Sequence, residues 1–240
     1  EGTQAMLNAV QNYPLLKGVQ TNLYKCFLPV AWRLSSGQGV SGLLHPEGPY
    51  DDPKGGALRE AVYARLRRHF QFQNQYMLFP IGHRVKYSIN VYGAPGPVAF
   101  DNISNLFVPG TVDACYLHDG QGLPGGIKTD DNAWDTAGHH DRIVRVDDAA
   151  LAVFARLYDE PGTPPRRARL PALHAGTLNS VLRKRAAYPR RLGDLGKDRR
   201  DQGGDDPALP GGCMYEQVAH EVHPAALPTG RDHLAHGGLE

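Results

Sequence analysis

The sequence has few cysteines and no long hydrophobic run, and each absence excludes a class of protein. Cys26, Cys115 and Cys213 lie far apart and form no Cys-x-x-Cys pair, so neither a disulfide framework nor a thiolate metal site is indicated. The apolar runs are far shorter than the roughly 20 residues of a membrane-spanning helix, and no basic-then-apolar signal segment opens the chain. We therefore expect a cytoplasmic protein with free thiols and no membrane partner.

Common nucleotide-binding and hydrolase motifs are also missing. The chain contains no Gly-x-x-x-x-Gly-Lys-Ser/Thr loop that could hold phosphates, and no Gly-x-Ser-x-Gly around a nucleophile. The spacing of His220 and His223, and of His233 and His236, would suit a metal ion, but no zinc-site pattern surrounds either pair. We expect no metal site.

Charge is nearly balanced over the whole chain but unevenly distributed along it. The formal net charge is +1, yet residues 1–196 carry 22 basic and 17 acidic side chains, whereas residues 197–240 carry four basic and eight acidic ones. A moderately basic body suits a polyanionic partner such as DNA, although it is equally compatible with an ordinary solvated surface.

What the sequence does contain is an alternation of helical and strand patterns. The spacing of apolar residues predicts a helix over residues 21–34 with Thr21 as its N-cap, and a second helix over residues 56–68. Residues 40–45 predict a strand buried on both faces, as in a parallel sheet, followed by a loop over residues 46–53. Alternation predicts two further strands, at residues 70–73 and 87–91.

The turn-rich segment from Gly93 to Pro97 suggests a boundary near residue 95, after which the pattern is less regular. We expect strands at residues 105–108, 114–117 and 142–146, and helices that open at Asp147 and at Pro171. Residues 196–240 have few large apolar side chains and no periodicity, and we expect a disordered or degenerate tail.

The most specific signal lies between Asn22 and Tyr92, where several short motifs follow one another in a fixed order. They are Asn22-Leu23-Tyr24-x-x-Phe27 at a helix start, a Gly-x-Gly stop, an apolar strand ending at Pro46, and Leu78-Phe79-Pro80 before the last strand. This order resembles the second half of a gamma-class adenine-specific DNA methyltransferase. The segment His45–Gly56 reads His-Pro-Glu-Gly-Pro-Tyr-Asp-Asp-Pro-Lys-Gly-Gly. It is similar to the corresponding sequence segment of type IIG restriction–modification and BREX-type phage-defence methyltransferases.

The resemblance implies a fold and an organisation. Residues 1–95 would form the C-terminal half of a Rossmann-like α/β methyltransferase domain with a mixed sheet. Residues 96–195, over which the likeness is weaker, would form a smaller α+β region leading to target recognition.

The resemblance also implies a cofactor, a partner and site residues. The methyl donor would be S-adenosyl-L-methionine, and the target would be an adenine flipped out of double-stranded DNA. Phe27 matches the aromatic residue that walls the cofactor's adenine ring, and Phe79 matches the one that stacks on the flipped base. Arg84 and Lys86 could contact phosphates, and restriction or defence subunits would be further partners. Core packing is the alternative role of both phenylalanines.

Two parts of the resembled family are absent from this sequence. The family's Asn/Asp-Pro-Pro-aromatic loop does not occur, because Thr163-Pro164-Pro165-Arg166 has the prolines without the polar acceptor or the aromatic residue. The upstream Gly-rich segment that holds the cofactor's methionine end is missing too. Since the chain begins at Glu1 without an initiator methionine, we expect a fragment with no catalytic residue of its own and no activity alone. The alternative is a non-catalytic DNA-binding or scaffolding component of a defence complex.

Overall fold

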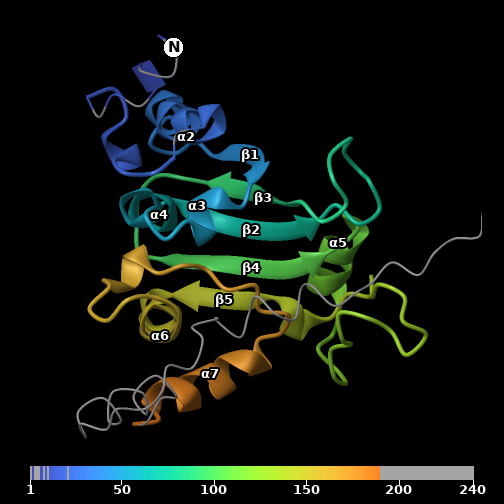
Figure 1. The fold of residues 1–240 in the computed structure, drawn as a ribbon. Helices are drawn as coiled ribbons and strands as arrows, with labels where there is room; N and C mark the ends of the chain where they lie inside the picture. Colours follow the sequence, from blue (N-terminus) through green and yellow to red (C-terminus); the bar gives the residue numbers. More distant parts are fainter. Residues whose placement is uncertain (1, 3–5, 8, 10, 21, 190–240) are drawn as a thin grey trace, which may run out of the picture. The chain divides into compact units, whose positions relative to one another are not determined.

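The fold is a mixed α/β arrangement built on one five-stranded sheet, which confirms the expected fold class at that level (Figure 1). The computed structural model describes residues 2, 6, 7, 9, 11–20 and 22–189. The strand order is β1-β3-β2-β4-β5, with β2 and β4 parallel and all other neighbouring pairs antiparallel. The strands are β1 (Ser41–Pro46), β2 (Leu66–Gln73), β3 (Lys86–Tyr92), β4 (Ala99–Leu106) and β5 (Val144–Asp147).

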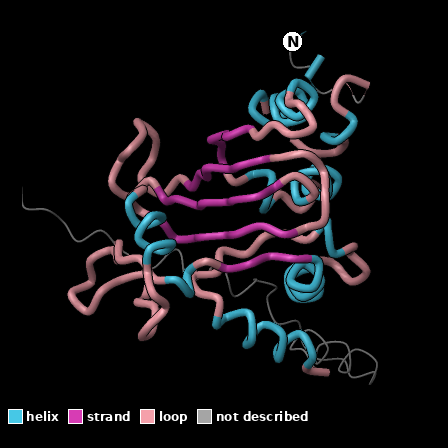
Figure 2. The backbone as a smooth tube through the Cα atoms, turned by 180° about the vertical axis from the view of Figure 1, so that it is seen from behind, coloured by secondary structure: helices cyan, strands magenta, loops and turns pink. Residues whose placement is uncertain are grey.

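Helices α3 and α4 lie in front of the sheet in Figure 1, whereas the view from behind shows the strands in front of them (Figure 2). The helices are α2 (Leu23–Leu34), α3 (Gly48–Asp51), α4 (Gly56–Tyr63), α5 (Gly110–Leu117), α6 (Asp148–Tyr158) and α7 (Thr177–Ala187). Short 3-10 turns occupy Pro14–Leu16, His140–Arg142 and Pro165–Arg167. None of the described helices is long and apolar enough to cross a membrane.

Two apolar clusters form the core. The larger one joins α4 and α6 to the strands through side chains at helical spacing, among them Leu58, Val62, Leu151 and Phe154. The smaller one includes Phe72, Tyr87, Ile103, Leu106 and Cys115. Since successive residues of a strand point to opposite faces, Phe72 and Tyr87 lie on the face opposite to Gln71 and Ser88.

Distant parts of the chain are joined by a segment that crosses α3 and α4. The Tyr63 hydroxyl donates to the carbonyl of Ala168 at 2.7 Å, and Arg59 Nε donates to the carbonyl of Arg167 at 2.9 Å. The backbone N–H of Leu170 donates to the carbonyl of Tyr50 at 3.2 Å. The segment 165–170 is therefore fixed to helices more than 100 residues earlier in the sequence.

Several predicted elements are confirmed. The first helix, the strands at residues 70–73 and 87–91 and the cap at Asp147 are present, and Asp147 Oδ1 accepts from the N–H of Ala150 at 2.8 Å. The first helix has Asn22 rather than Thr21 as its N-cap. The expected tail and its histidine pairs lie outside the described residues.

Other predictions are wrong, and β1 is the most informative case. It is not a strand buried on both faces but an edge strand, paired only with β3 in the described part of the chain, and alternate side chains such as Leu44 are exposed. A short apolar run cannot distinguish a central strand from the edge of a sheet.

The predicted loop over residues 46–53 contains α3, because Tyr50 is buried and anchors one helical turn beneath the sheet. The second helix ends at Tyr63 rather than at residue 68, since β2 begins at Leu66. Residues 114–117 belong to helix α5 and not to a strand, and the last helix begins at Thr177 rather than at Pro171.

Two further strands have other bounds than predicted. The strand expected at residues 105–108 covers Ala99–Leu106, and the one expected at 142–146 covers Val144–Asp147. The segment 93–97 joins β3 to β4 within one sheet, and the boundary near residue 95 stays a prediction.

Candidate nucleic-acid interface

The link between β2 and β3, here called the 74–85 loop, is an exposed apolar segment at the carboxyl end of β2 (Figure 1). Six of its large apolar side chains are 37–57% exposed: Tyr76, Met77, Leu78, Phe79, Ile81 and Val85. Apolar residues gathered in this way on a surface mark a site of interaction.

Asn74 holds the loop in shape. Its side chain is fully buried, and its Nδ2 donates to the carbonyls of Phe79 at 2.9 Å and Ile81 at 2.8 Å. Its Oδ1 accepts from the N–H of Phe79 at 3.1 Å, and its backbone N–H donates to the carbonyl of Val85. Because these bonds tie both ends of the loop to one residue, the exposed side chains are presented from a defined backbone.

Phe79 is fixed on one side and open on the other. Its ring meets the ring of Tyr87 edge-on, with centroids 5.0 Å apart, and Tyr87 stacks in turn on Phe72 at 5.6 Å. The ring is still 37% exposed. An aromatic side chain held in this way loses little conformational freedom when a flat partner stacks on it.

A second loop extends the aromatic surface. Tyr76 contacts Phe107 with ring centroids 6.5 Å apart, and Phe107 contacts Trp134 at 4.7 Å. The ammonium group of Lys128 lies 4.6 Å from the centroid of the Trp134 ring, in cation–π geometry. The buried ring of Phe107 therefore lies between the 74–85 loop and the segment from Lys128 to Trp134.

The end of the 74–85 loop and the start of β3 carry cations without carboxylate partners among the described residues. Arg84 and Lys86 are exposed at the end of the loop and the start of β3. Within the described residues, neither they nor Lys128 form an ion pair. Unpaired cations beside exposed aromatic rings are the chemistry that binds phosphates and bases together.

Phe27 lies elsewhere. It is 57% exposed on α2, near the similarly exposed Leu23, and so is not part of the core.

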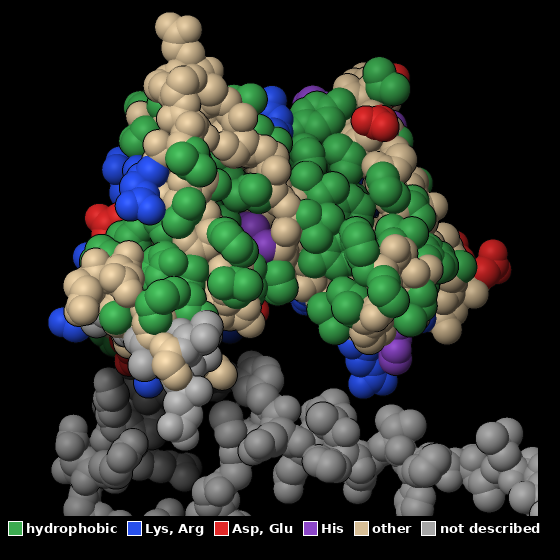
Figure 3. Space-filling model, turned by 90° about the horizontal axis from the view of Figure 1, so that it is seen from above, with side chains coloured by type: hydrophobic (Ala, Val, Ile, Leu, Met, Phe, Trp, Pro, Cys, Tyr) green, Lys and Arg blue, Asp and Glu red, His purple; other side chains and the backbone are tan. Residues whose placement is uncertain are grey.

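Seen from the side of β1, hydrophobic side chains gather on two raised parts of the surface with a furrow between them (Figure 3). Comparison with Figure 1 places α2 on one part and the 74–85 loop on the other.

The exposed ring of Phe27 would fit as one wall for a purine. Neither cavity described in the structure includes Phe27 in its lining. The assignment of Phe27 to S-adenosylmethionine therefore stays a prediction.

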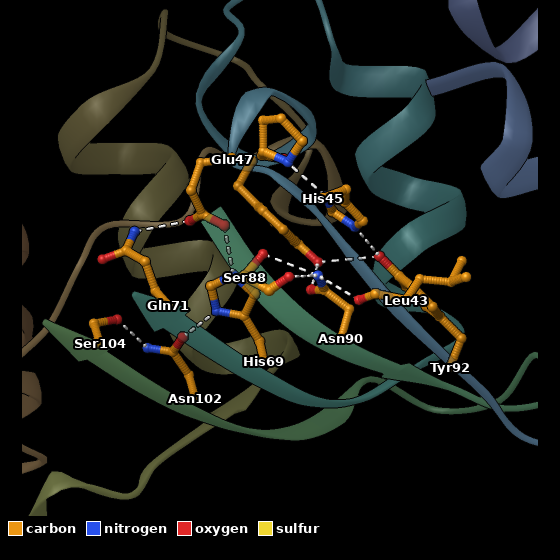
Figure 4. Close-up of polar contacts among 12 residues, drawn as sticks. Leu43, His45, Glu47, His69, Gln71, Ser88, Asn90, Tyr92, Asn102 and Ser104 are labelled. Atoms are coloured by element: carbon orange, nitrogen blue, oxygen red, sulfur yellow. Dashed lines mark hydrogen bonds and ion pairs between the residues drawn. The ribbon is translucent and has the colours of Figure 1, made fainter. Parts of the chain in front are cut away.

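A buried polar network supports the strand ends that carry the loop (Figure 4). Glu47 lies between two strand residues: its Oε2 accepts from Gln71 Nε2 at 2.8 Å, and its Oε1 lies 3.2 Å from His69 Nε2. His69 Nδ1 lies 2.6 Å from Asn102 Oδ1, and Asn102 Nδ2 donates to Ser104 Oγ at 3.1 Å. The network therefore links the start of α3 to β2 and β4.

A second branch ties α3 to β3 and β1. The Tyr50 hydroxyl donates to Asn90 Oδ1 at 2.5 Å, and Asn90 Nδ2 donates to Ser88 Oγ at 2.9 Å. His45 Nε2 lies 2.9 Å from the Tyr92 hydroxyl. Burial raises the pKa of Tyr92 and lowers that of His45, which favours the neutral forms of both side chains.

The ionisation of Glu47 is set by its neighbours. Burial acts to raise the pKa of its carboxyl group, but His69 and the hydrogen bonds from His69, Ser88 and Gln71 outweigh burial and lower the pKa to about 2. The carboxylate and His69 are both buried, 7% and 1% exposed. The pair therefore cannot reach a substrate from the surface, and its role is to hold the strands.

Asn74, Glu47 and His69 were not recognised as site residues from the sequence. A signal was present for the network, because Gln71 on one predicted strand, with His69 just before it, and Ser88 and Asn90 on the next alternate with apolar residues. Polar residues at a period of two on adjacent strands share one face of the sheet. No comparable signal identifies Asn74, whose role depends on the closed shape of the loop.

Comparisons with known proteins give only distant likenesses. No family model and no curated protein matches the sequence. Among solved structures, the chain is similar to the type IIG restriction endonuclease BpuSI, at 15% identity and a TM-score of 0.33, over 43% of this chain and 13% of that one.

It is also similar to the M protein of the type I restriction enzyme EcoKI, at 12% identity and a TM-score of 0.36, over 86% of this chain and 49% of that one. A third likeness is to a type I restriction–modification system, at 15% identity and a TM-score of 0.37, over 78% of this chain and 42% of that one. The chain spans less than half the length of each of these structures. Likeness at this level concerns the fold and does not identify an activity.

Proposed function

We propose that this chain is part of an adenine-specific DNA methyltransferase of a restriction–modification or phage-defence system, and that the 74–85 loop faces the target base. The sequence resemblance over Asn22–Tyr92 suggests the class. The observation that carries the proposal is Phe79, whose ring is held by Tyr87 on one side and exposed on the other at the end of β2. A ring in that position can stack on a base that has left the duplex.

The cations at the end of the 74–85 loop and the start of β3 would meet the DNA backbone. Arg84 and Lys86 are exposed and have no carboxylate partner among the described residues, so phosphates would find both charges available. Contacts of this kind position DNA without reading its sequence, and the recognition sequence would depend on other groups.

S-adenosylmethionine is the methyl donor in this proposal, and it would supply an electrophilic methyl group for the exocyclic amine of adenine. The part of this chain in that reaction is limited to Phe27, which would cover the cofactor's adenine ring. Because the Asn/Asp-Pro-Pro-aromatic loop is absent from the sequence, methyl transfer is not expected from this chain alone.

A second candidate function is a non-catalytic DNA-binding or scaffolding component of a defence complex. The exposed aromatic and cationic side chains of the 74–85 loop support it equally, because DNA retention by them requires no cofactor. Binding of S-adenosylmethionine that is weakened by Phe27→Ala would favour the methyltransferase, whereas DNA binding without any cofactor binding would favour the second candidate.

Phe79→Ala is expected to weaken the binding of DNA that contains an unpaired adenine by about tenfold or more, because stacking contributes roughly 1–3 kcal/mol per base. Fluorescence anisotropy with a duplex carrying adenine opposite an abasic site would measure the change. Leu117→Ala, a substitution at an apolar side chain that is 86% exposed on α5, is the matched control and should leave the affinity unchanged. Equal affinity of the Phe79→Ala protein would remove the base-stacking role.

The double substitution Arg84→Gln with Lys86→Gln is expected to weaken DNA binding similarly for all sequences. It should also reduce the slope of log affinity against log salt concentration by about two, since each phosphate contact releases about one counterion. The control is Lys54→Gln, which removes an exposed charge from the turn before α4. An unchanged slope in the double variant would show that neither cation meets a phosphate.

A further inference from the structure

We infer that a cavity between the N-terminal segment and α2 binds a small organic anion with a compact apolar body. The cavity has a volume of about 300 Å³ and is separate from the 74–85 loop, which contributes no residue to its lining. Three parts of the chain line it: residues 12–15, the second half of α2 and Arg65. This volume is at the lower end of the range for small-molecule sites.

The charged and buried polar groups of the lining are hydrogen-bond donors. Trp32 Nε1 is buried, and among the described residues it has no hydrogen-bond partner. The guanidinium of Arg65 lies 4.9 Å from the centroid of the Trp32 ring, and only one of its N–H groups is used, in a bond of 2.9 Å to the carbonyl of Ala61. Arg33 also lines the cavity.

Negative charge is missing from the same place. No Asp or Glu is among the described residues that line the cavity, and in the described part of the chain neither Arg33 nor Arg65 forms an ion pair. Burial lowers the pKa of Arg65, as expected for a guanidinium group partly withdrawn from water. A donor-rich lining with two uncompensated guanidinium groups selects an anion, and the guanidinium fork suits a carboxylate or a phosphate.

Apart from Asn12, the remaining walls are largely apolar and partly flat. Tyr13, Pro29 and Val30 line the cavity together with the Trp32 ring, which is held edge-on by Tyr92 at 5.6 Å. A second cavity of about 100 Å³ shares Trp32 and Arg65, so this pair borders space on two sides. A small aromatic phosphate or carboxylate has both acceptor oxygens for the donors and a flat apolar ring that can pack against the walls.

The test uses the full chain with Trp134→Phe, which leaves Trp32 as the sole tryptophan because the sequence contains two. Phenyl phosphate is expected to change the Trp32 fluorescence saturably, with a dissociation constant below about 1 mM. Arg33→Gln and Arg65→Gln should each weaken this binding by about tenfold or more, whereas Arg156→Gln, the control at an exposed arginine of α6 that does not line the cavity, should not. Benzyl alcohol, the uncharged counterpart, and inorganic phosphate, which lacks the ring, should both bind more weakly.

The inference fails if phenyl phosphate gives no saturable change up to about 10 mM, well above the expected dissociation constant. It also fails if benzyl alcohol binds as tightly as phenyl phosphate, or if Arg33→Gln and Arg65→Gln leave the affinity unchanged. Since Arg33 is exposed, Arg33→Gln keeps the test valid even where Arg65→Gln disturbs the fold. Thermal unfolding of each variant, with Arg65→Lys as the charge-retaining counterpart, separates lost binding from lost structure.

Discussion

Replacing Glu47 with alanine is expected to lower the free energy of unfolding by about 3–5 kcal/mol. The substitution removes the acceptor for Gln71 Nε2 and the partner of His69, and both side chains are buried. A buried polar group without a partner costs more than the original pair contributed, because water cannot replace the lost contact. Urea denaturation at neutral pH, followed by far-UV circular dichroism, measures the change.

Glu60→Ala is the matched control. Glu60 also lies 2.8 Å from an arginine nitrogen, that of Arg167, but both side chains are about half exposed. Exposed pairs contribute about 0–1 kcal/mol, and the control should change stability by no more than that. Similar losses for the two variants would show that burial of Glu47 has no energetic consequence.

Acid gives an independent readout of the same residue. The pKa of Glu47 is lowered on folding from 4.5 to about 2, so its ionised form stabilises the fold above the unfolded-state pKa. That contribution is lost as the pH falls from about 5 to 2, and it corresponds to about 3 kcal/mol. The Glu47→Gln protein should therefore lose less stability over this pH range than the original chain does.

Replacing Asn74 with alanine is expected to release the 74–85 loop and to cost about 3 kcal/mol, since three side-chain hydrogen bonds disappear at once. The amide of Phe79 loses its acceptor, so its hydrogen exchange should become at least about tenfold faster. Hydrogen-exchange mass spectrometry and limited proteolysis of the loop measure both effects.

Gln75→Ala provides the comparison, because Gln75 is the adjacent residue and is less buried than Asn74. Its substitution should leave the exchange of Phe79 unchanged. If Asn74→Ala behaves in the same way, the loop keeps its shape by apolar packing and not through Asn74. Under the proposed function, the Asn74→Ala protein should also bind unpaired adenine more weakly, because Phe79 would no longer be held on Tyr87.

Local patterns in the sequence were sufficient for much of the fold but not for its assembly. The apolar spacing of Leu23 to Leu34 and the alternation at residues 87–91 depend on neighbours in the chain, and both predictions are confirmed. The position of β1 at the edge, next to β3, depends on pairing between distant segments, which composition does not reveal. For the same reason the strand predicted at residues 114–117 is wrong, since four apolar residues suit a strand as well as the end of a short helix.

The residues of the candidate site were also predictable only where their role depends on the local sequence. The exposure of Phe79 and Phe27 is a property of the folded surface, and the sequence alone left core packing open as an alternative for both. The role of Glu47 was hidden because a carboxylate in a segment rich in proline and acid looks like a loop residue. Its burial follows from Tyr50, which anchors α3 beneath the strands.

The segment 165–170, bound to Arg59, Tyr63 and Tyr50, has a consequence for how the chain folds. These contacts close loops of more than 100 residues, and the entropy of closing them must be lost before the contacts stabilise anything. Chains dominated by contacts of high sequence separation fold slowly. During synthesis α3 and α4 would be complete long before residues 165–170 are made. The carbonyl groups that accept hydrogen bonds from Arg59 and Tyr63 would be among the last parts of the described chain to be synthesised.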